Sequence, residues 1–139
     1  MLDQTDWKIL QCLKKNSRMQ WQEIGKAVHL TGQAVAARIK RMQELAIIEG
    51  FTIILNQEKL GKPLLAFITV FMKSTNHTSF QQFLSEQEEI LEAHRISGEG
   101  CYWLKASLSN QQDLNHLLDS ILLHGNYRIH LSIQSIKKS

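Results

Sequence analysis

The stretch LTGQAVAARIKRMQ, residues 30–43, joins small side chains to a cluster of positive charge. We expect a helix over about 32–45, because Thr31 is a good N-cap residue and apolar side chains recur at helical spacing. The apolar positions are Val35, Ile39, Met42 and Leu45. The remaining positions are small, polar or basic: Gln33, Ala34, Ala37, Arg38, Lys40 and Arg41. Such a face can lie close against a negatively charged partner.

Two shorter helical patterns precede this helix. Asp3 and Asp6 resemble a capping box at the start of the first, which is expected to end near Lys15. Its apolar stripe is expected to consist of Trp7, Ile9, Leu10 and Leu13, and the second helix spans about 20–28. The residues HLTG then interrupt the pattern. Three short helices with a break between the second and third predict a helix-turn-helix, winged-helix-like domain, whose third helix enters the major groove of double-stranded DNA.

The residue types of the third helix suit contact with DNA. Gln33 can pair with adenine, and Thr31 can donate to a phosphate after capping the helix. Alanine lets the backbone approach base edges and can touch a thymine methyl group, and the basic side chains can hold phosphates. A basic third helix also occurs in protein-interaction modules, so spacing alone leaves that alternative open.

Charge and composition narrow the class of protein. The chain has 139 residues, with 43% hydrophobic and 21% charged residues, as in folded globular proteins. Residues 1–50 carry eight Lys and Arg against five Asp and Glu, whereas residues 51–139 carry eight of each. The net charge of +3 therefore lies entirely in the N-terminal third. This asymmetry favours a polyanionic partner for that region.

Several classes of function are not expected. Cys12 and Cys101 fit no metal or redox spacing, so we expect a cytoplasmic protein with no metal and no cofactor. The longest apolar run, residues 64–72, is about half a membrane span and is typical of a buried strand. The N-terminus has no long apolar core of the kind found in signal peptides.

The pattern changes after the third helix. Residues 47–56 are rich in β-branched side chains and predict an extended strand or hairpin, and QEKLGKP at 57–63 holds the only proline. We therefore expect a helix-turn-helix domain over 1–50, a strand and linker over 51–63, and a second domain over 64–139. Its expected elements are strand 64–73, helix 79–87, strands 90–97 and 101–108, helix 111–124 and strand 127–136. This order predicts an α+β chain with a C-terminal ferredoxin-like βαββαβ domain.

Alternation along two strands predicts an uncovered sheet face. Cys101, Trp103, Lys105 and Ser107 should face away from the helices, and His130 should do so in the last strand. Two helices cover only one face of such a sheet, and a tryptophan on the other face suggests a second subunit. We therefore predict an oligomer interface that includes Trp103, Lys105 and His130.

The sequence resembles the Lrp/AsnC, or feast/famine, family of transcriptional regulators almost from end to end. The opening LDQTDWKILQCLKKNSR, the segment EIGKAVHLTGQAVAARIKRMQELAIIEGF and the turn RISGEGCYWLK each resemble a family motif in the expected order. The family favours an arginine at Arg38 and an acidic residue at Cys101. It also favours a glycine at Ala46 and a smaller polar residue at Trp21, where packing against the first helix is expected.

The resemblance implies a sequence-specific DNA-binding repressor or activator. It implies that the C-terminal domain pairs subunits into dimers, often assembled further into tetramers or octamers. It also implies an amino acid or another small molecule as effector, bound near the turn between two strands. The corresponding residues are Ser97, Gly98, Glu99, Gly100 and Cys101.

Other functions remain as alternatives. The chain has no paired catalytic carboxylates, glycine-rich phosphate loop or nucleophile signature, so no enzyme is expected. The six histidines are dispersed, although His94 and His130 fall on predicted strands and are candidates to approach each other. Subunits of sirohaem decarboxylase share the two-domain plan, but the neutral C-terminal half does not suit a polycarboxylate substrate. A ligand-sensing or assembly module with weak DNA binding is the other alternative.

Overall fold

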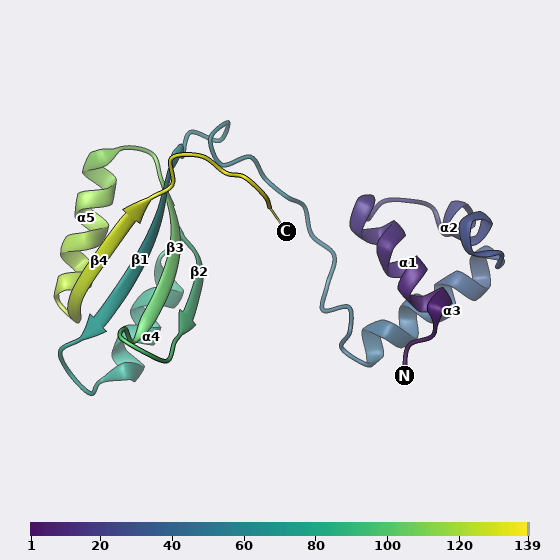
Figure 1. Cartoon of the computed structure of the whole chain (residues 1–139), viewed down its shortest axis with the longest axis horizontal. Helices are drawn as coiled ribbons and strands as arrows, with labels where there is room; N and C mark the ends of the chain where they lie inside the picture. The colour runs from purple at the N-terminus through teal and green to yellow at the C-terminus, as the bar shows by residue number, and fades with distance from the viewer. Residues whose placement is uncertain (139) are drawn as a thin grey trace. The chain divides into compact units, whose positions relative to one another are not determined.

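The structure, a computed structural model, describes residues 1–138. The chain divides into two compact units, Met1–Ile54 and a second that begins at Leu55. The first unit holds three helices, α1 (Gln4–Lys15), α2 (Trp21–Val28) and α3 (Gly32–Glu44) (Figure 1). These bounds confirm the predicted three-helix arrangement to within a few residues.

One apolar cluster holds the three helices together. Each helix contributes side chains at helical spacing, so that a single stripe of each helix is buried. The buried members are Ile9, Leu13, Ile24, Val28, Val35, Ile39 and Met42. Leu45, expected on the buried face of α3, instead lies at its C-cap and is half exposed.

The turn between α2 and α3 requires a close backbone approach. His29 ends α2 in the left-handed region with φ 61°, and the Thr31 hydroxyl accepts a hydrogen bond of 3.1 Å from the Ala34 N–H at the start of α3. A Cβ at Gly25 would lie 2.3 Å from the Leu30 carbonyl oxygen. Only glycine therefore fits where α2 passes the turn.

The strand or hairpin predicted over 47–56 does not form in this chain. Residues 51–56 have no regular secondary structure, and Phe51, Ile53 and Ile54 are exposed. A β-strand requires a hydrogen-bonded neighbour, and no described residue of the chain supplies one for this segment. Residues 47–56 therefore have the β-branched composition of a strand but lack a neighbouring strand to pair with.

Ala46 leaves α3 in a conformation that suits glycine. Its φ is 59°, and the N–H groups of Ile47 and Ile48 both donate to the Met42 carbonyl, at 2.9 and 3.1 Å. A left-handed alanine costs about 1–2 kcal/mol, and part of this cost is offset because glycine has more freedom in the unfolded chain.

We expect Ala46→Gly to raise the free energy of unfolding by about 0.5–1 kcal/mol, since it removes the steric cost at this C-terminal cap. Chemical denaturation followed by tryptophan fluorescence measures the change. An unchanged or lowered stability would show that the left-handed alanine is not strained.

The second unit is a four-stranded sheet with two helices. The strands lie in the order β2-β3-β1-β4, and each neighbouring pair is antiparallel. The elements are β1 (Leu64–Met72), α4 (His77–Glu86), β2 (Ile90–Arg95), β3 (Tyr102–Leu108), α5 (Gln111–Leu122) and β4 (Gly125–Leu131). This confirms the predicted ferredoxin-like βαββαβ fold.

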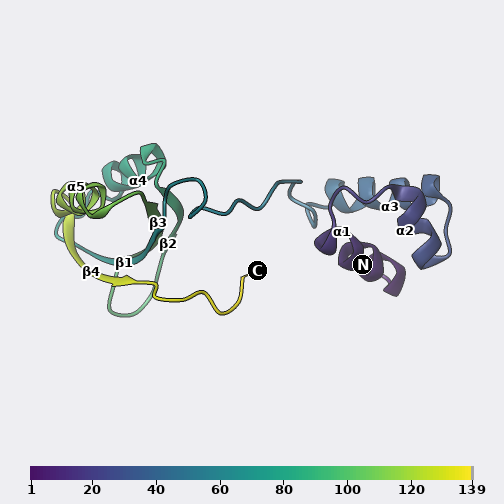
Figure 2. The ribbon, with the colours of Figure 1, turned by 90° about the horizontal axis from the view of Figure 1, so that it is seen from above.

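Both helices cover the same face of the sheet, as Figure 2 shows. Alternate residues of β1 and β3 point into this layer, where they pack against the apolar stripes of α4 and α5. The core includes Ile68, Val70, Leu104, Phe80, Leu117 and Ile121. The other face of the sheet, called the open face below, has no layer of the second unit on it within the described residues (Figure 2).

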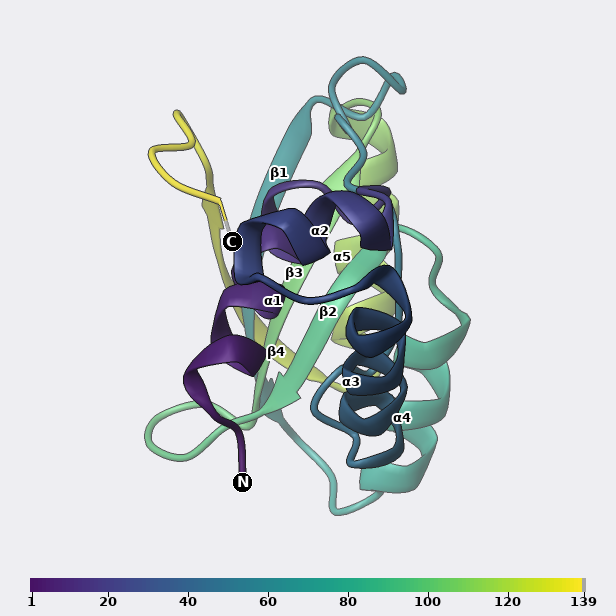
Figure 3. The ribbon, with the colours of Figure 1, turned by 90° about the vertical axis from the view of Figure 1, so that its right-hand side faces the viewer.

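The last strand is shorter than predicted. β4 ends at Leu131 rather than near residue 136, and its final sheet hydrogen bond runs from the Ser132 N–H to the Leu65 carbonyl, at 2.8 Å. Its neighbour β1 begins at Leu64, so residues beyond 132 have no strand beside them. Residues 132–138, called the tail below, leave the sheet on the side away from α4 and α5 (Figure 3).

Candidate nucleic-acid interface

α3 presents a continuous exposed ridge. Gln33, Ala37 and Lys40 are exposed and follow the i, i+4, i+7 spacing, so they lie in one line along the helix. Arg41 is exposed beside Lys40, and Ala34 is partly buried next to the ridge. Small side chains at its centre and cations toward its C-terminal end give it the shape and charge that a nucleic-acid surface needs.

Arg38 is bound to carboxylates within the chain. Its Nη1 donates to both carboxylate oxygens of Asp3, at 2.8 and 2.7 Å, and to Oδ1 of Asp6, at 3.1 Å. Asp6 is buried, and its carboxylate also accepts a hydrogen bond from the Asp3 N–H in the capping box of α1. The sequence placed Arg38 among the phosphate contacts. The structure shows that Arg38 joins α3 to the start of α1.

This ion pair predicts a pH-dependent contribution to stability. The hydrogen bond from Arg38, and after it the Asp6 N–H, lower the pKa of Asp3 below its ordinary value of 3.8. Because the folded-state pKa is the lower one, the stabilisation is present above the unfolded pKa and is lost as the pH falls through the folded pKa. We expect the unaltered protein to be more stable than Asp3→Asn near neutral pH, and this difference to shrink as the pH falls below about 4 and through the lowered pKa of Asp3.

Denaturation curves of the two proteins at a series of pH values measure this difference. Asp113→Asn is a control, because Asp113 is also an acidic residue in the first turn of a helix but belongs to α5. A stability difference for Asp3→Asn that persists unchanged into acid would contradict the assigned ion pair.

The start of α2 lies against the start of α3. A Cβ at Gly32 would be 3.5 Å from the Gln22 backbone nitrogen and 3.8 Å from the Trp21 carbonyl carbon. The N-terminal ends of two helices therefore lie together, and their free N–H groups favour anions. Sequence reasoning missed this pairing, because it depends on the turn geometry. Trp21, expected to pack on α1, is half exposed beside this pair of helix ends.

The open face of the second unit carries a pair of stacked aromatic rings. Phe67 and Trp103 have ring centroids 5.7 Å apart, and both side chains are partly buried. Phe67 is the register partner of Lys105 on β3 and of His130 on β4. The three residues predicted for an interface therefore share one face, with Phe67 at its centre. Phe67 was missed because every residue of its strand except Thr69 is apolar, so alternation did not separate its two faces.

The two strand histidines do not approach each other. His94 lies on β2 and His130 on β4, which are opposite edges of the sheet with two strands between them. His94 instead pairs with Glu92, with Nε2 and Oε1 2.8 Å apart, and this hydrogen bond lowers the pKa of Glu92. The prediction that the two histidines approach each other was wrong. The alternation of residues along one strand shows which face a side chain is on, but not which strands are neighbours in the sheet.

The turn after β2 has the geometry of a tight connection. Gly98 has φ 92°, and a Cβ at Gly100 would lie 2.4 Å from Cγ2 of Thr69, so neither position suits a larger residue. The Cys101 N–H donates to the Val70 carbonyl at 2.8 Å. Its side chain packs against the core of the second unit, so the prediction that Cys101 faces away from the helices was wrong, because Cys101 precedes β3 and does not follow its alternation. Glu99 is exposed and is the one carboxylate within residues 97–101.

Residues 1–138 contain neither a cluster of metal-ligating side chains nor a helix able to span a membrane. Within that range, no group of three or more His, Cys, Asp or Glu side chains is placed to hold a metal ion. No helix in the same range is both long enough and apolar enough to cross a membrane.

Known protein families match both units. Residues 2–43 match the AsnC-type helix-turn-helix domain, and residues 65–139 match the Lrp/AsnC ligand binding domain. The chain is 45% identical over 137 residues to the HTH-type transcriptional regulator LrpB of Bacillus subtilis (strain 168). The aligned residues cover 99% of this chain and 92% of LrpB. It is 34% identical to LrpA of the same organism over 96% of this chain and 98% of LrpA.

Solved structures agree with these matches. The structure of B. subtilis LrpC has a TM-score of 0.95 at 25% identity and covers 100% of this chain and 99% of LrpC. A complex of the transcriptional regulator NMB0573 from Neisseria meningitidis with L-Met has a TM-score of 0.93 at 28% identity, over 100% and 94% of the two chains. These relatives are transcriptional regulators and not enzymes. The chain therefore belongs to the Lrp/AsnC family of DNA-binding transcriptional regulators.

Proposed function

We propose that the chain regulates transcription as a homodimer that places two copies of α3 in successive major grooves of double-stranded DNA. The exposed ridge of α3 carries this proposal, because its small and basic side chains have no other partner in the described chain. A symmetric dimer reads two half-sites about one helical turn apart, so its operator is expected to be roughly palindromic. The protein would act in the cytoplasm, where its DNA lies.

Each part of the ridge has a distinct proposed role. Gln33 pairs with a base edge, and Ala34 and Ala37 let the backbone approach the groove floor. Lys40 and Arg41 bind phosphates and set the register. The adjoining starts of α2 and α3, with the Thr31 hydroxyl, offer a further phosphate contact. Arg38 positions α3 through Asp3 and Asp6 and makes no direct contact in this assignment.

The open face of the second unit is the proposed dimer interface. It presents the stacked Phe67 and Trp103 pair, with Lys105 and His130 beside them. Aromatic rings on a sheet face without a covering layer favour burial against an equivalent face. Two-fold pairing of these faces gives the dimer, and contacts between dimers give tetramers or octamers.

The turn at residues 97–101 is the proposed effector site. The relative NMB0573 was solved with L-Met, and an amino acid or a related small molecule is the ligand class proposed for this chain. Glu99 is the carboxylate available there to a ligand ammonium group, because the thiol of Cys101 packs toward the core. An effector bound at this turn would change assembly or DNA affinity.

Two substitutions on α3 test the DNA-binding assignment. We expect Arg41→Ala to weaken binding to all sequences alike and to lower the slope of log affinity against log salt by about one, since one phosphate contact is lost.

We expect Gln33→Ala to relax the preference at one base position, at a cost of about 1–3 kcal/mol in binding free energy for the preferred base. Fluorescence anisotropy with base-substituted duplexes measures both.

Lys14→Ala is the charge control, since Lys14 is exposed on α1 away from the ridge. It should leave the salt slope close to that of the unaltered protein. An Arg41→Ala variant that keeps both its affinity and its salt slope would show that another surface binds the phosphates.

A further inference from the structure

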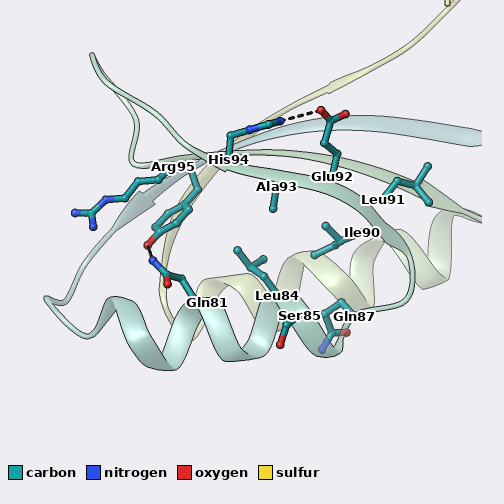
Figure 4. Close-up of a pocket in the computed structure, with 11 residues that line it drawn as sticks. Gln81, Leu84, Ser85, Gln87, Ile90, Leu91, Glu92, Ala93, His94 and Arg95 are labelled. Atoms are coloured by element: carbon teal, nitrogen blue, oxygen red, sulfur yellow. Dashed lines mark hydrogen bonds and ion pairs between the residues drawn. The ribbon is translucent and has the colours of Figure 1, made fainter. Parts of the chain in front are cut away.

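A groove runs between α4 and the edge strand β2. Its volume is about 380 Å³, and Figure 4 shows Leu84, Ile90 and Ala93 pointing into the space between the helix and the strand. Gln81 and Ser85 line the helix side. Glu92 and His94 extend on the other side of the strand (Figure 4). The groove is thus apolar along its floor and polar along its rim.

β2 has an unused hydrogen-bonding edge. It is the outermost strand of the sheet, and among the described residues its only strand partner is β3. Its outer N–H and C=O groups can therefore accept a further strand. Strand addition gives affinity through the backbone, and a groove beside the edge gives selectivity through side chains.

The tail has the composition of a strand that lacks a partner. Ile133 and Ile136 are 99% and 84% exposed, although β-branched residues favour a pleated, half-buried surface. In an extended segment these two side chains project to opposite faces, because they are three residues apart. Such a segment on the edge of β2 would bury one isoleucine in the groove and the other on the open face.

Charge complements this fit. Glu86, Glu88 and Glu89 lie where α4 ends and β2 begins, and the tail carries Lys137 and Lys138. A strand that runs along β2 with its lysines at this end brings opposite charges together. These charged side chains are exposed, so their attraction would determine the direction and register of the added strand more than it would raise the affinity.

We propose that the tail of one copy of this chain adds as a strand to the free edge of β2 in a second copy, and inserts an isoleucine into the groove between α4 and β2. The tail leaves its own sheet on the side of the open face (Figure 3), which is the side where a second copy is proposed to lie. This interchain contact goes beyond the proposed function, because it does not depend on DNA or effector.

The tail of the same chain cannot make this contact. β4 and β2 are separated by β1 and β3, so a strand added outside β2 lies four strand spacings, about 19 Å, from β4. Seven extended residues span about 23 Å. Crossing its own sheet would therefore use nearly all of residues 132–138, so Ile133 and Ile136 of the same chain could not reach the groove beside β2.

Chemical cross-linking between two differently labelled copies tests the proposal. In a full-length chain with Cys12→Ser and Cys101→Ser, one copy carries Ser135→Cys in the tail and the other carries Ala93→Cys in the groove. The two are mixed, allowed to exchange and treated with a short bis-maleimide. We expect a covalent heterodimer that forms roughly tenfold faster than with the control pair Ser74→Cys and Ala93→Cys, because binding raises the local concentration of the two thiols.

Ser74 is a suitable control because it is exposed at the opposite end of β1 from the start of the tail. Adding Ile133→Glu and Ile136→Glu to the tail copy should lower the rate to the control level. Adding Leu123→Glu should not, although Leu123 is also 84% exposed. Equal rates for the test and control pairs would overturn the proposal. So would a cross-link that forms only within one chain carrying both Ser135→Cys and Ala93→Cys.

Discussion

Gly25→Ala is expected to destabilise the helix-turn-helix unit by about 3 kcal/mol and to abolish specific DNA binding under conditions where the unaltered protein binds. The added Cβ would meet the Leu30 carbonyl oxygen at 2.3 Å and the carbonyl carbons of Leu30 and Thr31 at 3.3 Å. These are backbone atoms of the turn, so the turn must move rather than a flexible side chain. Any such movement shifts the start of α3, which Thr31 caps.

Gly50→Ala is the matched control, since a Cβ there meets nothing within 4 Å. The free energy of unfolding, measured by tryptophan fluorescence with Trp103→Phe in both proteins so that only Trp7 and Trp21 report, and the anisotropy of a labelled duplex should change only for Gly25→Ala. A Gly25→Ala protein with unaltered stability would mean that α2 and the turn separate without cost, and the close packing assigned to them would be wrong.

Trp103→Glu is expected to give a monomer in sedimentation velocity and to weaken DNA binding roughly 100-fold, because the second half-site contact is then lost. The substitution puts a carboxylate at the centre of the proposed interface, beside Phe67. Two such carboxylates would face each other across a two-fold axis in a desolvated surface, which is strongly unfavourable. The fold itself should survive, because Trp103 faces away from the core between sheet and helices.

Leu123→Glu provides the comparison for this experiment. Leu123 is an exposed apolar residue at the C-cap of α5, and α5 covers the face of the sheet opposite the open face. It should leave both the sedimentation coefficient and the DNA affinity unchanged. A Trp103→Glu protein that remains dimeric would move the interface away from the open face.

The local pattern of the sequence predicted the helices, the strands and the faces that they bury, because these features depend on residues close together in the chain. The helical spacing of Val35, Ile39 and Met42 located α3, and the alternation of Tyr102 with Trp103 assigned the two faces of β3. The order of strands and helices identified the ferredoxin-like fold, because that order admits few compact arrangements. Family resemblance then identified the class of regulator, which the comparisons confirmed.

What the sequence did not predict depends on residues far apart in the chain. Arg38 donates a hydrogen bond to Asp3, which lies 35 positions earlier in the sequence, so the residue pattern of α3 alone could not predict this partner. Trp7 was expected in the buried stripe of α1 but is 58% exposed, because the three-helix cluster is too small to cover it. Residues 47–56 and 132–136 have strand composition but no neighbour in the described chain, since strand formation requires a partner.

The contacts made by α3 with DNA, the effector turn and the oligomer interface remain predictions. The structure supports the exposed positions of Gln33, Ala37, Lys40 and Arg41, and it supports an internal role for Arg38. It also adds Phe67 to the proposed oligomer interface and the start of α2 to the proposed DNA-binding surface, neither of which the sequence predicted.

Binding to the DNA upstream of the protein's own gene is the most direct test of whether α3 reads a sequence. Fluorescence anisotropy should compare this duplex with a scrambled duplex while salt is raised from low to physiological concentration, first without and then with each amino acid. We predict tight, selective binding to the upstream duplex that falls steeply with salt. Weak binding of equal strength to both duplexes, with and without every amino acid, would contradict the account.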